Sequence, residues 1–265
     1  MNAALEQVLD DLPDMAVAVS GGVDSLTLAV LAARRLGPER ALMVHAVSPA
    51  VPGEATERVK RRAQAEGWRL QVIDAGEFAD PNYRANPVNR CFFCKTSLYG
   101  AIAARTDRQI LSGANADDLT EYRPGLDAAR DHGVRHPYLE AGMDKAAVRA
   151  LARTLGLPEI AELPASPCLA SRVETGLAID AEELAAIHRA ESLLQAALKP
   201  RTVRCRIRAA GVVLELDAET LARLEEGRRE ALSAEVAALM PQAVAARGVS
   251  FAAYRTGSAF LAPRP

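Results

Sequence analysis

The segment Ser20-Gly21-Gly22-Val23-Asp24-Ser25 joins an apolar run, residues 15–19, to a helix-like stretch, residues 26–36. A strand that leads through a glycine-rich turn into a helix presents backbone N–H groups at the positive end of that helix, where phosphate binds. The missing Cβ atoms of Gly21 and Gly22 let an anion approach the main chain. Ser20 and Ser25 add hydroxyl donors, and Asp24 suits a divalent cation held beside a phosphate. The sequence therefore predicts a phosphate site at this turn.

Around this turn, the first half of the chain alternates strand-like and helix-like segments. We predict strands over residues 15–20, 41–47, 68–74 and 109–112, and helices over 23–36, 54–67, 94–105 and 144–155. Such alternation is typical of an α/β protein with a doubly wound parallel sheet and crossover helices. Ligands of these sheets bind outside the carboxyl ends of the strands, which is where the Ser20 turn falls.

The alternating strand and helix patterns stop over residues 157–176, where prolines 158, 164 and 167 mark a boundary or a functional loop. Beyond it we predict a helix over residues 180–198, a hairpin of strands 202–207 and 212–216, a helix over 221–239 and a strand over 249–254. We therefore divide the chain into a nucleotide-binding domain, residues 1–160, and a smaller C-terminal α+β domain, residues 161–265.

Composition narrows the function classes. The chain has 265 residues and a net charge of −2, which gives no general attraction to nucleic acid or to an anionic membrane. No run approaches the about 18 apolar residues that a membrane helix needs. The first residues are acidic and mixed, unlike a signal peptide, so we expect a cytoplasmic protein. In that reducing compartment the four cysteines point to metal binding or chemistry instead of disulfides.

The cysteines fall into three settings. Cys91 and Cys94 form a C-x-x-C, which lets two thiolates bind one metal or cluster. Cys168 lies in a proline-bracketed loop, and Arg172 four residues later favours its thiolate. Cys205 lies in a strand-like run, where burial is the simpler fate. Three thiols without a clear fourth ligand fit a [4Fe–4S] cluster with one open iron, and the alternative is a half-buried C-x-x-C that binds nothing.

The Ser20 turn is neither a Walker A motif, which needs a lysine, nor the G-x-G-x-x-G of dinucleotide folds. It resembles the PP-loop of the ATP pyrophosphatase superfamily, whose members split ATP into AMP and pyrophosphate while adenylating a carboxylate or carbonyl oxygen. The competing interpretation is an ordinary strand-to-helix turn that happens to be rich in serine and glycine.

Several further motifs together resemble the ATP-dependent sulfur transferases called LarE, the pyridinium-3,5-bisthiocarboxylic acid mononucleotide synthases of nickel-pincer cofactor biosynthesis. The resemblance runs over nearly the whole chain. PASPCLASR with YRPG is highly specific, whereas SGGVDS identifies only the superfamily. The motifs are NRCFFCK at 89–95, SGANADDLTEYRPG at 112–125, PYLEAGMDKAAVRALARTLGLP at 137–158, PASPCLASR at 164–172 and YRTGS at 254–258.

The resemblance implies a chemistry and assigns the two domains to ATP and to sulfur transfer with substrate-phosphate binding. ATP with Mg²⁺ would adenylate one carboxylate of pyridinium-3,5-biscarboxylic acid mononucleotide, and sulfur would then replace AMP to give a thiocarboxylate for the lactate racemase cofactor. In single-cysteine members the cysteine matching Cys168 gives up its sulfur and becomes dehydroalanine. Cys91 and Cys94 resemble the three-cysteine branch, where a [4Fe–4S] cluster delivers sulfide and Cys168 is a ligand.

Other residues follow by motif position. Arg204 and Arg206 alternate on a strand, and an R-x-R strand in the family binds the substrate phosphate. We add Arg172 to this phosphate group. Asn115 and Asp117, with Asp118, follow a strand end where ATP or its Mg²⁺ would lie, although paired aspartates equally cap a helix. Two weaker candidates for a metal-binding acidic group are Glu191 and Glu215.

Alternatives of other classes are a PP-loop enzyme of tRNA thiolation and a non-catalytic ATP-binding sensor. The near-neutral charge argues against the first, because an enzyme acting on tRNA needs a basic RNA-binding segment. A sensor needs neither the cysteines nor the R-x-R strand. As partners we expect a small-molecule nucleotide substrate, a homo-oligomeric assembly, and a sulfide source or sulfur-donor protein.

Overall fold

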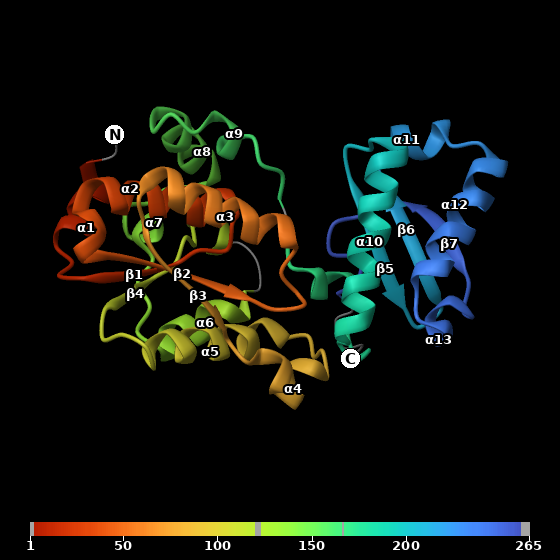
Figure 1. The fold of residues 1–265 in the computed structure, drawn as a ribbon, viewed down its shortest axis with the longest axis horizontal. Helices are drawn as coiled ribbons and strands as arrows, with labels where there is room; N and C mark the ends of the chain where they lie inside the picture. The colour runs from red at the N-terminus through yellow and green to blue at the C-terminus, as the bar shows by residue number, and fades with distance from the viewer. Residues whose placement is uncertain (1–2, 120–122, 166, 261–265) are drawn as a thin grey trace. The chain divides into compact units, whose positions relative to one another are not determined.

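The computed structural model of the chain divides into two compact units, which are described separately (Figure 1). The N-terminal unit comprises Met1–Asp80 and Cys91–Ser166, and the C-terminal unit comprises Pro81–Arg90 and Pro167–Pro265. The described residues are 3–119, 123–165 and 167–260, so residues 120–122 and 166 of the motifs quoted above lie outside them.

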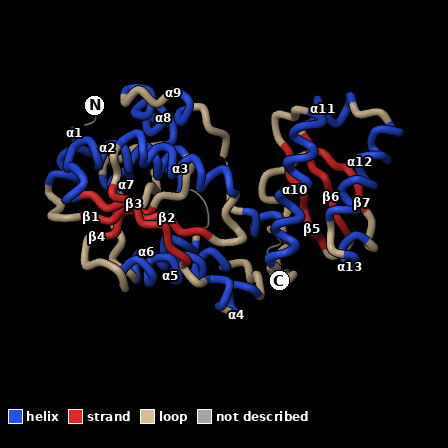
Figure 2. The backbone as a smooth tube through the Cα atoms, in the orientation of Figure 1, coloured by secondary structure: helices blue, strands red, loops and turns tan. Residues whose placement is uncertain are grey.

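Four parallel strands form the sheet of the N-terminal unit, in the order β3-β2-β1-β4 (Figure 2). Their bounds are Met15–Ala18 for β1, Ala41–Val47 for β2, Arg69–Asp74 for β3 and Gln109–Leu111 for β4. β1 pairs with β2 on one side and with β4 on the other. The chain thus winds from β1 to β3 in one direction and then crosses back for β4. The predicted doubly wound parallel α/β fold is confirmed.

Each face of this sheet carries its own core, because successive side chains of a strand point to opposite faces. Met15 and Val17 of β1 pack into one core with helices α1, α2, α3, α8 and α9, whereas Ala16 packs into the other with α5 and α6. Figure 1 shows these helices on the two faces. The helices are α1 Ala3–Asp10, α2 Val23–Arg40, α3 Gly53–Glu66, α5 Arg90–Ala103, α6 Pro124–Asp131, α7 Pro137–Glu140, α8 Lys145–Thr154 and α9 Pro158–Ala161, with 3₁₀ turns η1 Glu77–Ala79 and η2 Ala116–Leu119.

Two of these helices differ from the predicted ranges. α2 was expected to end at residue 36, and its regular backbone does break there, because Gly37 adopts a φ of 75° before Pro38. A further turn then carries the helix to Arg40. The helix expected over residues 94–105 begins earlier, at Arg90, where Arg90 N donates to Pro87 O at 2.9 Å. No glycine or proline separates Pro87 from Cys94, so the helix starts as soon as that proline permits.

A three-stranded sheet in the order β5-β6-β7 organises the C-terminal unit. β5, Val203–Arg208, and β6, Gly211–Leu216, form the predicted antiparallel hairpin, and β7, Val249–Ala253, runs parallel to β6. α10 packs against β5, and α12 packs against β7 and α10. The helices are α4 Pro81–Arg84, η3 Leu169–Arg172, α10 Ala181–Leu198, α11 Ala218–Arg223, α12 Glu226–Leu239 and α13 Gln242–Ala245.

The single helix predicted over residues 221–239 is wrong. The structure has two helices there, because Leu224 is extended, with φ −84° and ψ 109°, and its side chain is buried. Asp217 caps α11 by accepting a hydrogen bond from Thr220 N at 3.1 Å. Gly227 follows three residues later but lies within the first turn of α12, so it does not mark the position of the break.

No helix within the described part of the chain combines the length and apolar character needed to cross a membrane.

Candidate active site

The loop of residues 20–25, here called the Ser20 loop, connects β1 to α2 and is held closed by its two serines. Ser20 N donates to Ser25 Oγ at 3.0 Å, and the two hydroxyl oxygens are also 3.0 Å apart. Ser25 Oγ in turn donates to Gly22 O at 3.3 Å. The N-cap residue of α2 is Gly22, which has no side chain to satisfy the first amides of the helix. Those amides and the helix dipole favour an anion here.

Two glycines allow this loop to pack against its neighbours. Gly21 has a φ of 84°, and a Cβ on it would lie 2.7 Å from Ala55 O at the start of α3. A Cβ on Gly113, just after β4, would lie 2.9 Å from Ser25 N. Gly22 has more room, because its nearest neighbour would be 3.7 Å away. The structure thus requires Gly21 and Gly113 for close backbone packing, which brings the end of β4 against the first turn of α2.

The Ser20 loop lies at the switch point of the sheet. β1 pairs with β2 on one side and with β4 on the other, so the strand order reverses at β1 and the loops that follow β1 and β4 lie at this point. In doubly wound folds the crevice at this point is the ligand site. The loop follows β1 as predicted, and phosphate binding there stays a prediction.

Asp24 is the centre of the polar contacts in this crevice. Asn115 Nδ2 donates to Asp24 Oδ1 at 3.2 Å, so the structure brings together two residues predicted to bind ATP. On the other side, Lys145 Nζ lies 2.5 Å from Asp24 Oδ2. Tyr138 OH donates to the Asp24 carbonyl at 3.1 Å, and burial, together with the Asp24 charge, raises the pKa of Tyr138. Carboxylate, amide and ammonium groups therefore converge at the positive end of α2.

The predicted aspartates after β4 are fixed by local hydrogen bonds. Asn115 Oδ1 accepts from Asp117 N at 3.2 Å at the start of η2, while Asn115 N donates to Asp118 Oδ2 at 3.0 Å. Asp117 Oδ2 also accepts from Lys145 N at 3.3 Å, and Asp118 pairs with Arg123 at 3.1 Å. Capping, the alternative considered from the sequence, thus accounts for part of their role.

Lys145 and Tyr138 are site residues that sequence reasoning missed. Lys145 is the first residue of α8, directly after the N-cap Asp144. A lysine is unfavourable there, because the positive end of the helix dipole repels its ammonium group. That conflict was a readable signal that Lys145 needs an anionic partner, and Asp24 is that partner in the structure.

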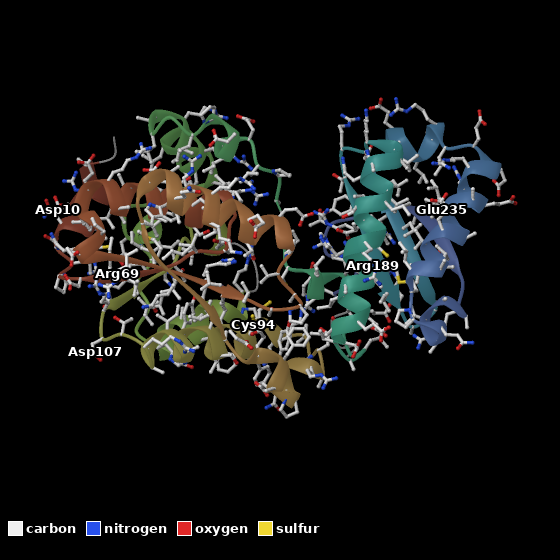
Figure 3. The ribbon with its side chains drawn as sticks, in the orientation of Figure 1. Asp10, Arg69, Cys94, Asp107, Arg189 and Glu235 are labelled. Carbon is white, nitrogen blue, oxygen red and sulfur yellow. The ribbon has the colours of Figure 1, made fainter. Side chains whose placement is uncertain are left out.

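All four cysteines are free thiols, and they divide between the units. Cys91 and Cys94 are half-buried on α5 of the N-terminal unit, with Cys94 labelled in Figure 3. Cys168 is exposed at the N-cap of η3 in the C-terminal unit. Cys205 is fully buried on β5, and burial raises the pKa of its thiol, as expected for a core residue. Within the ranges that the structure describes, no three His, Cys, Asp or Glu side chains gather into a metal site.

Arg172 holds the loop that carries Cys168. Its Nη1 donates to Pro167 O at 2.7 Å and to Cys168 O at 3.2 Å, so it contacts the main chain of the cysteine. Its Nε and Nη2 donate to the two carboxylate oxygens of Glu191, each at 3.0 Å, and only 4% of the Arg172 side chain is exposed. This bidentate pair fixes the geometry around Cys168.

The arginines of β5 form a second network. Arg206 Nε donates to Glu215 Oε2 at 3.0 Å and Arg208 Nη2 to Glu215 Oε1 at 2.8 Å, while Arg206 Nη1 donates to Ser171 O at 2.9 Å. Arg204 stacks over the Tyr254 ring at 5.8 Å, and burial and the Arg172 charge lower its pKa. We call the guanidinium groups of residues 172, 204, 206 and 208 the arginine cluster.

The two weaker candidates for metal binding, Glu191 and Glu215, accept hydrogen bonds from the arginine cluster. Glu215 accepts from two arginines, and its side chain is 2% exposed. Glu191 accepts from Arg172 and from Cys205 N. Three guanidinium groups therefore share two carboxylates, and this excess of positive charge suits a bound anion.

Comparisons with known proteins place these features in a family. No model of a protein family matches the chain. A pyridinium-3,5-bisthiocarboxylic acid mononucleotide synthase of Lactiplantibacillus plantarum is 30% identical over 208 residues, which are 77% of this chain and 75% of that protein. The chain belongs to this synthase family. An uncharacterized protein of Synechocystis sp. is 40% identical over 195 residues, 72% of either chain. Another of Methanocaldococcus jannaschii is 26% identical over 183 residues, 68% of either chain.

Membership of the synthase family agrees with the resemblance read from the motifs. It identifies the protein as a relative of an enzyme named for making a bisthiocarboxylic acid mononucleotide. The branch with three cysteines stays a prediction, because the relatives' names do not distinguish the source of the sulfur.

Proposed function

We propose that this protein is an ATP-dependent sulfur transferase that converts a carboxylate of pyridinium-3,5-biscarboxylic acid mononucleotide into a thiocarboxylate, in the biosynthesis of a nickel-pincer cofactor. Two findings support the proposal: the named relative makes the bisthiocarboxylic product, and the Ser20 loop opens at the switch point of the sheet. The observation that carries the proposal is the convergence of Asp24, Asn115 and Lys145 on the positive end of α2.

In the first half-reaction, a carboxylate oxygen of the substrate attacks the α-phosphorus of ATP. The bond from this phosphorus to the bridging oxygen of the β-phosphate breaks, and pyrophosphate leaves with the electron pair. The first amides of α2 and the hydroxyls of Ser20 and Ser25 would bind the departing phosphates. Asp24 would hold Mg²⁺, which supplies positive charge to the phosphates when bound. Lys145 would then neutralise phosphate charge beside it.

In the second half-reaction, sulfur attacks the adenylated carbonyl carbon, and the C–O bond to AMP breaks. We propose that Cys168 takes part in this step, because it is exposed and Arg172 holds its main chain. As a sacrificed donor, its Sγ would attack and its Cβ–Sγ bond would then break with loss of a Cα proton, leaving dehydroalanine and the thiocarboxylate.

The alternative source of sulfur is a [4Fe–4S] cluster on Cys91, Cys94 and Cys168. The donor set fits in kind, because none of the three thiols forms a disulfide and the first two are three residues apart on one helix. When bound, such a cluster supplies sulfide from its open iron. Intact mass after one turnover separates the two sources: a loss of about 34 Da reports dehydroalanine at Cys168, and an unchanged mass reports the cluster.

The arginine cluster would hold the phosphate of the mononucleotide. Arg204 is half-buried, and its guanidinium lies over the Tyr254 ring, which leaves a planar group suited to a phosphate. Arg206 and Arg172 are held by carboxylates and would add positive charge next to it. This assignment keeps the three predicted phosphate ligands and gives Glu191 and Glu215 the task of positioning them.

The test is ATP–pyrophosphate exchange that depends on the biscarboxylic mononucleotide. We expect exchange with the wild type, a large loss in Asp24→Asn, and no loss in the control Asp107→Asn, an exposed acid labelled in Figure 3. A tRNA enzyme would ignore this substrate, and a sensor would show no exchange with any substrate. Either result would overturn the proposal.

A further inference from the structure

A groove of about 440 Å³ runs along α3 beside the Ser20 loop, between α3 and α9. Three arginines of α3 line it, at positions 58, 61 and 62, together with Glu159 and Ile160 of α9. None of these residues belongs to the crevice around Asp24. The groove is therefore a separate feature of the N-terminal unit.

The groove is joined to the Ser20 loop through Arg58. Arg58 Nη1 donates to Gly21 O at 2.7 Å, so its guanidinium contacts the Ser20 loop through this carbonyl. Gly21 also lies against Ala55 at the start of α3. Arg58, which also lines the groove, therefore connects the groove to the Ser20 loop.

The charges in the groove are unevenly compensated. Arg62 forms ion pairs with Glu159 and Glu66. Arg61, by contrast, is exposed and makes no hydrogen bond or ion pair with any residue in the described ranges. Burial and the nearby charge of Arg61 lower the pKa of Arg58. Arg58 and Arg61 form no ion pair with a carboxylate among the described residues, and two such neighbouring cations gain from a multiply charged anion between them.

We propose that the α3–α9 groove is an oligophosphate subsite, in which Arg58 and Arg61 bind the pyrophosphate end of ATP or the free pyrophosphate that adenylation releases. The inference rests on the proposed function, because that reaction puts pyrophosphate in the Ser20 loop. Two arginines one turn apart on a helix present their forks on the same side, which suits a ligand carrying two phosphate groups.

The experiment measures calorimetric binding of inorganic pyrophosphate with Mg²⁺ to the full chain, and the KM for ATP in the exchange assay. The variants are Arg61→Ala and Arg61→Glu, because Arg61 touches neither the loop nor the core. The matched control is Arg69→Ala, an exposed arginine labelled in Figure 3 at the amino end of β3, the opposite end of the sheet from the Ser20 loop. AMP binding reports whether the loop itself is intact.

We expect pyrophosphate affinity to fall about tenfold in Arg61→Ala and further in Arg61→Glu, with AMP affinity unchanged and the control like the wild type. If the KM for ATP rises in parallel, the groove holds the end of ATP; if only pyrophosphate binding weakens, it holds the product. If both Arg61 variants bind pyrophosphate with wild-type affinity and still catalyse exchange, the proposed subsite is refuted and the proposed function is unaffected. A wild type without any exchange overturns the proposed function instead.

Discussion

Replacing Lys145 by methionine removes one ammonium group from the site and keeps the length of the side chain. Lys145 Nζ lies 2.5 Å from Asp24 Oδ2, but the two side chains are 33% and 25% exposed. Solvent therefore screens the pair, and its loss should lower the free energy of unfolding by about 1 kcal/mol or less. For a chain of this size that is a fall in Tm of about 2–4 °C.

The expected effect on adenylation is larger. During the reaction the same ammonium would face phosphate charge, and a hydrogen bond to a charged group contributes about 1.5–3 kcal/mol. Losing it corresponds to a fall of about 10- to 150-fold in kcat/KM for ATP. The assay is substrate-dependent ATP–pyrophosphate exchange, with unfolding in urea followed in parallel.

A matched control is Lys60→Met on α3. Lys60 pairs with Glu57 at 3.0 Å, and both side chains are about half exposed. Its loss should cost about 0.5 kcal/mol or less and leave exchange unchanged. Exchange at the wild-type rate in Lys145→Met would refute the assigned role. If Lys145→Met is unfolded, the result would instead show that Lys145 is needed for the stability of the fold.

Three further predictions concern packing, sulfur transfer and pH. Gly113→Ala should lower the free energy of unfolding by about 1–3 kcal/mol, because the new Cβ would lie 2.9 Å from Ser25 N. Gly227→Ala should raise it by about 0.5–1 kcal/mol, because Gly227 lies in α12 with open space around it. Unfolding in urea measures both changes. Cys168→Ala should abolish thiocarboxylate formation, which mass spectrometry measures. The variant should retain ATP–pyrophosphate exchange, because Cys168 is exposed and remote in sequence from the Ser20 loop. Thiocarboxylate formed at the wild-type rate would show that another residue carries out the sulfur chemistry. Burial lowers the pKa of His45 in the folded protein, so the unfolded chain takes up the proton first as pH falls. The free energy of unfolding should therefore fall as pH drops below about 6.5. His45→Gln should reduce this pH dependence between pH 7 and 5, and an unchanged pH dependence in the variant would contradict the assignment to His45.

The sheet was predictable because its signals are local. β2 was predicted at its observed bounds, 41–47, since an apolar run between polar turns has one obvious conformation. The caps of α8 and α10 were equally readable: Asp144 accepts from Ala147 N, and Asp180 accepts from Glu182 N. Such residues satisfy helix amides within a few positions, so no tertiary information is needed.

The features that sequence analysis did not predict depend on contacts between residues distant in the sequence. The helix breaks at Leu224, whose side chain is buried, and the position of this break depends on packing that the local sequence does not show. Lys145 meets Asp24 across 121 positions of sequence, and only its unfavourable place at a helix start hinted at a partner. The ion pairs of Glu215 with Arg206 and Arg208 also went unpredicted, because these residues become neighbours only when β5 and β6 pair.

Isotope transfer tests the central proposal, that the Ser20 loop serves to adenylate a carboxylate, most directly. The biscarboxylic mononucleotide is labelled with ¹⁸O in its carboxylates, and the AMP formed in one turnover is analysed by mass spectrometry. Attack of a carboxylate oxygen on the α-phosphorus, followed by cleavage of the C–O bond, predicts AMP that carries one ¹⁸O. Unlabelled AMP, or ADP as the nucleotide product, would contradict the proposal.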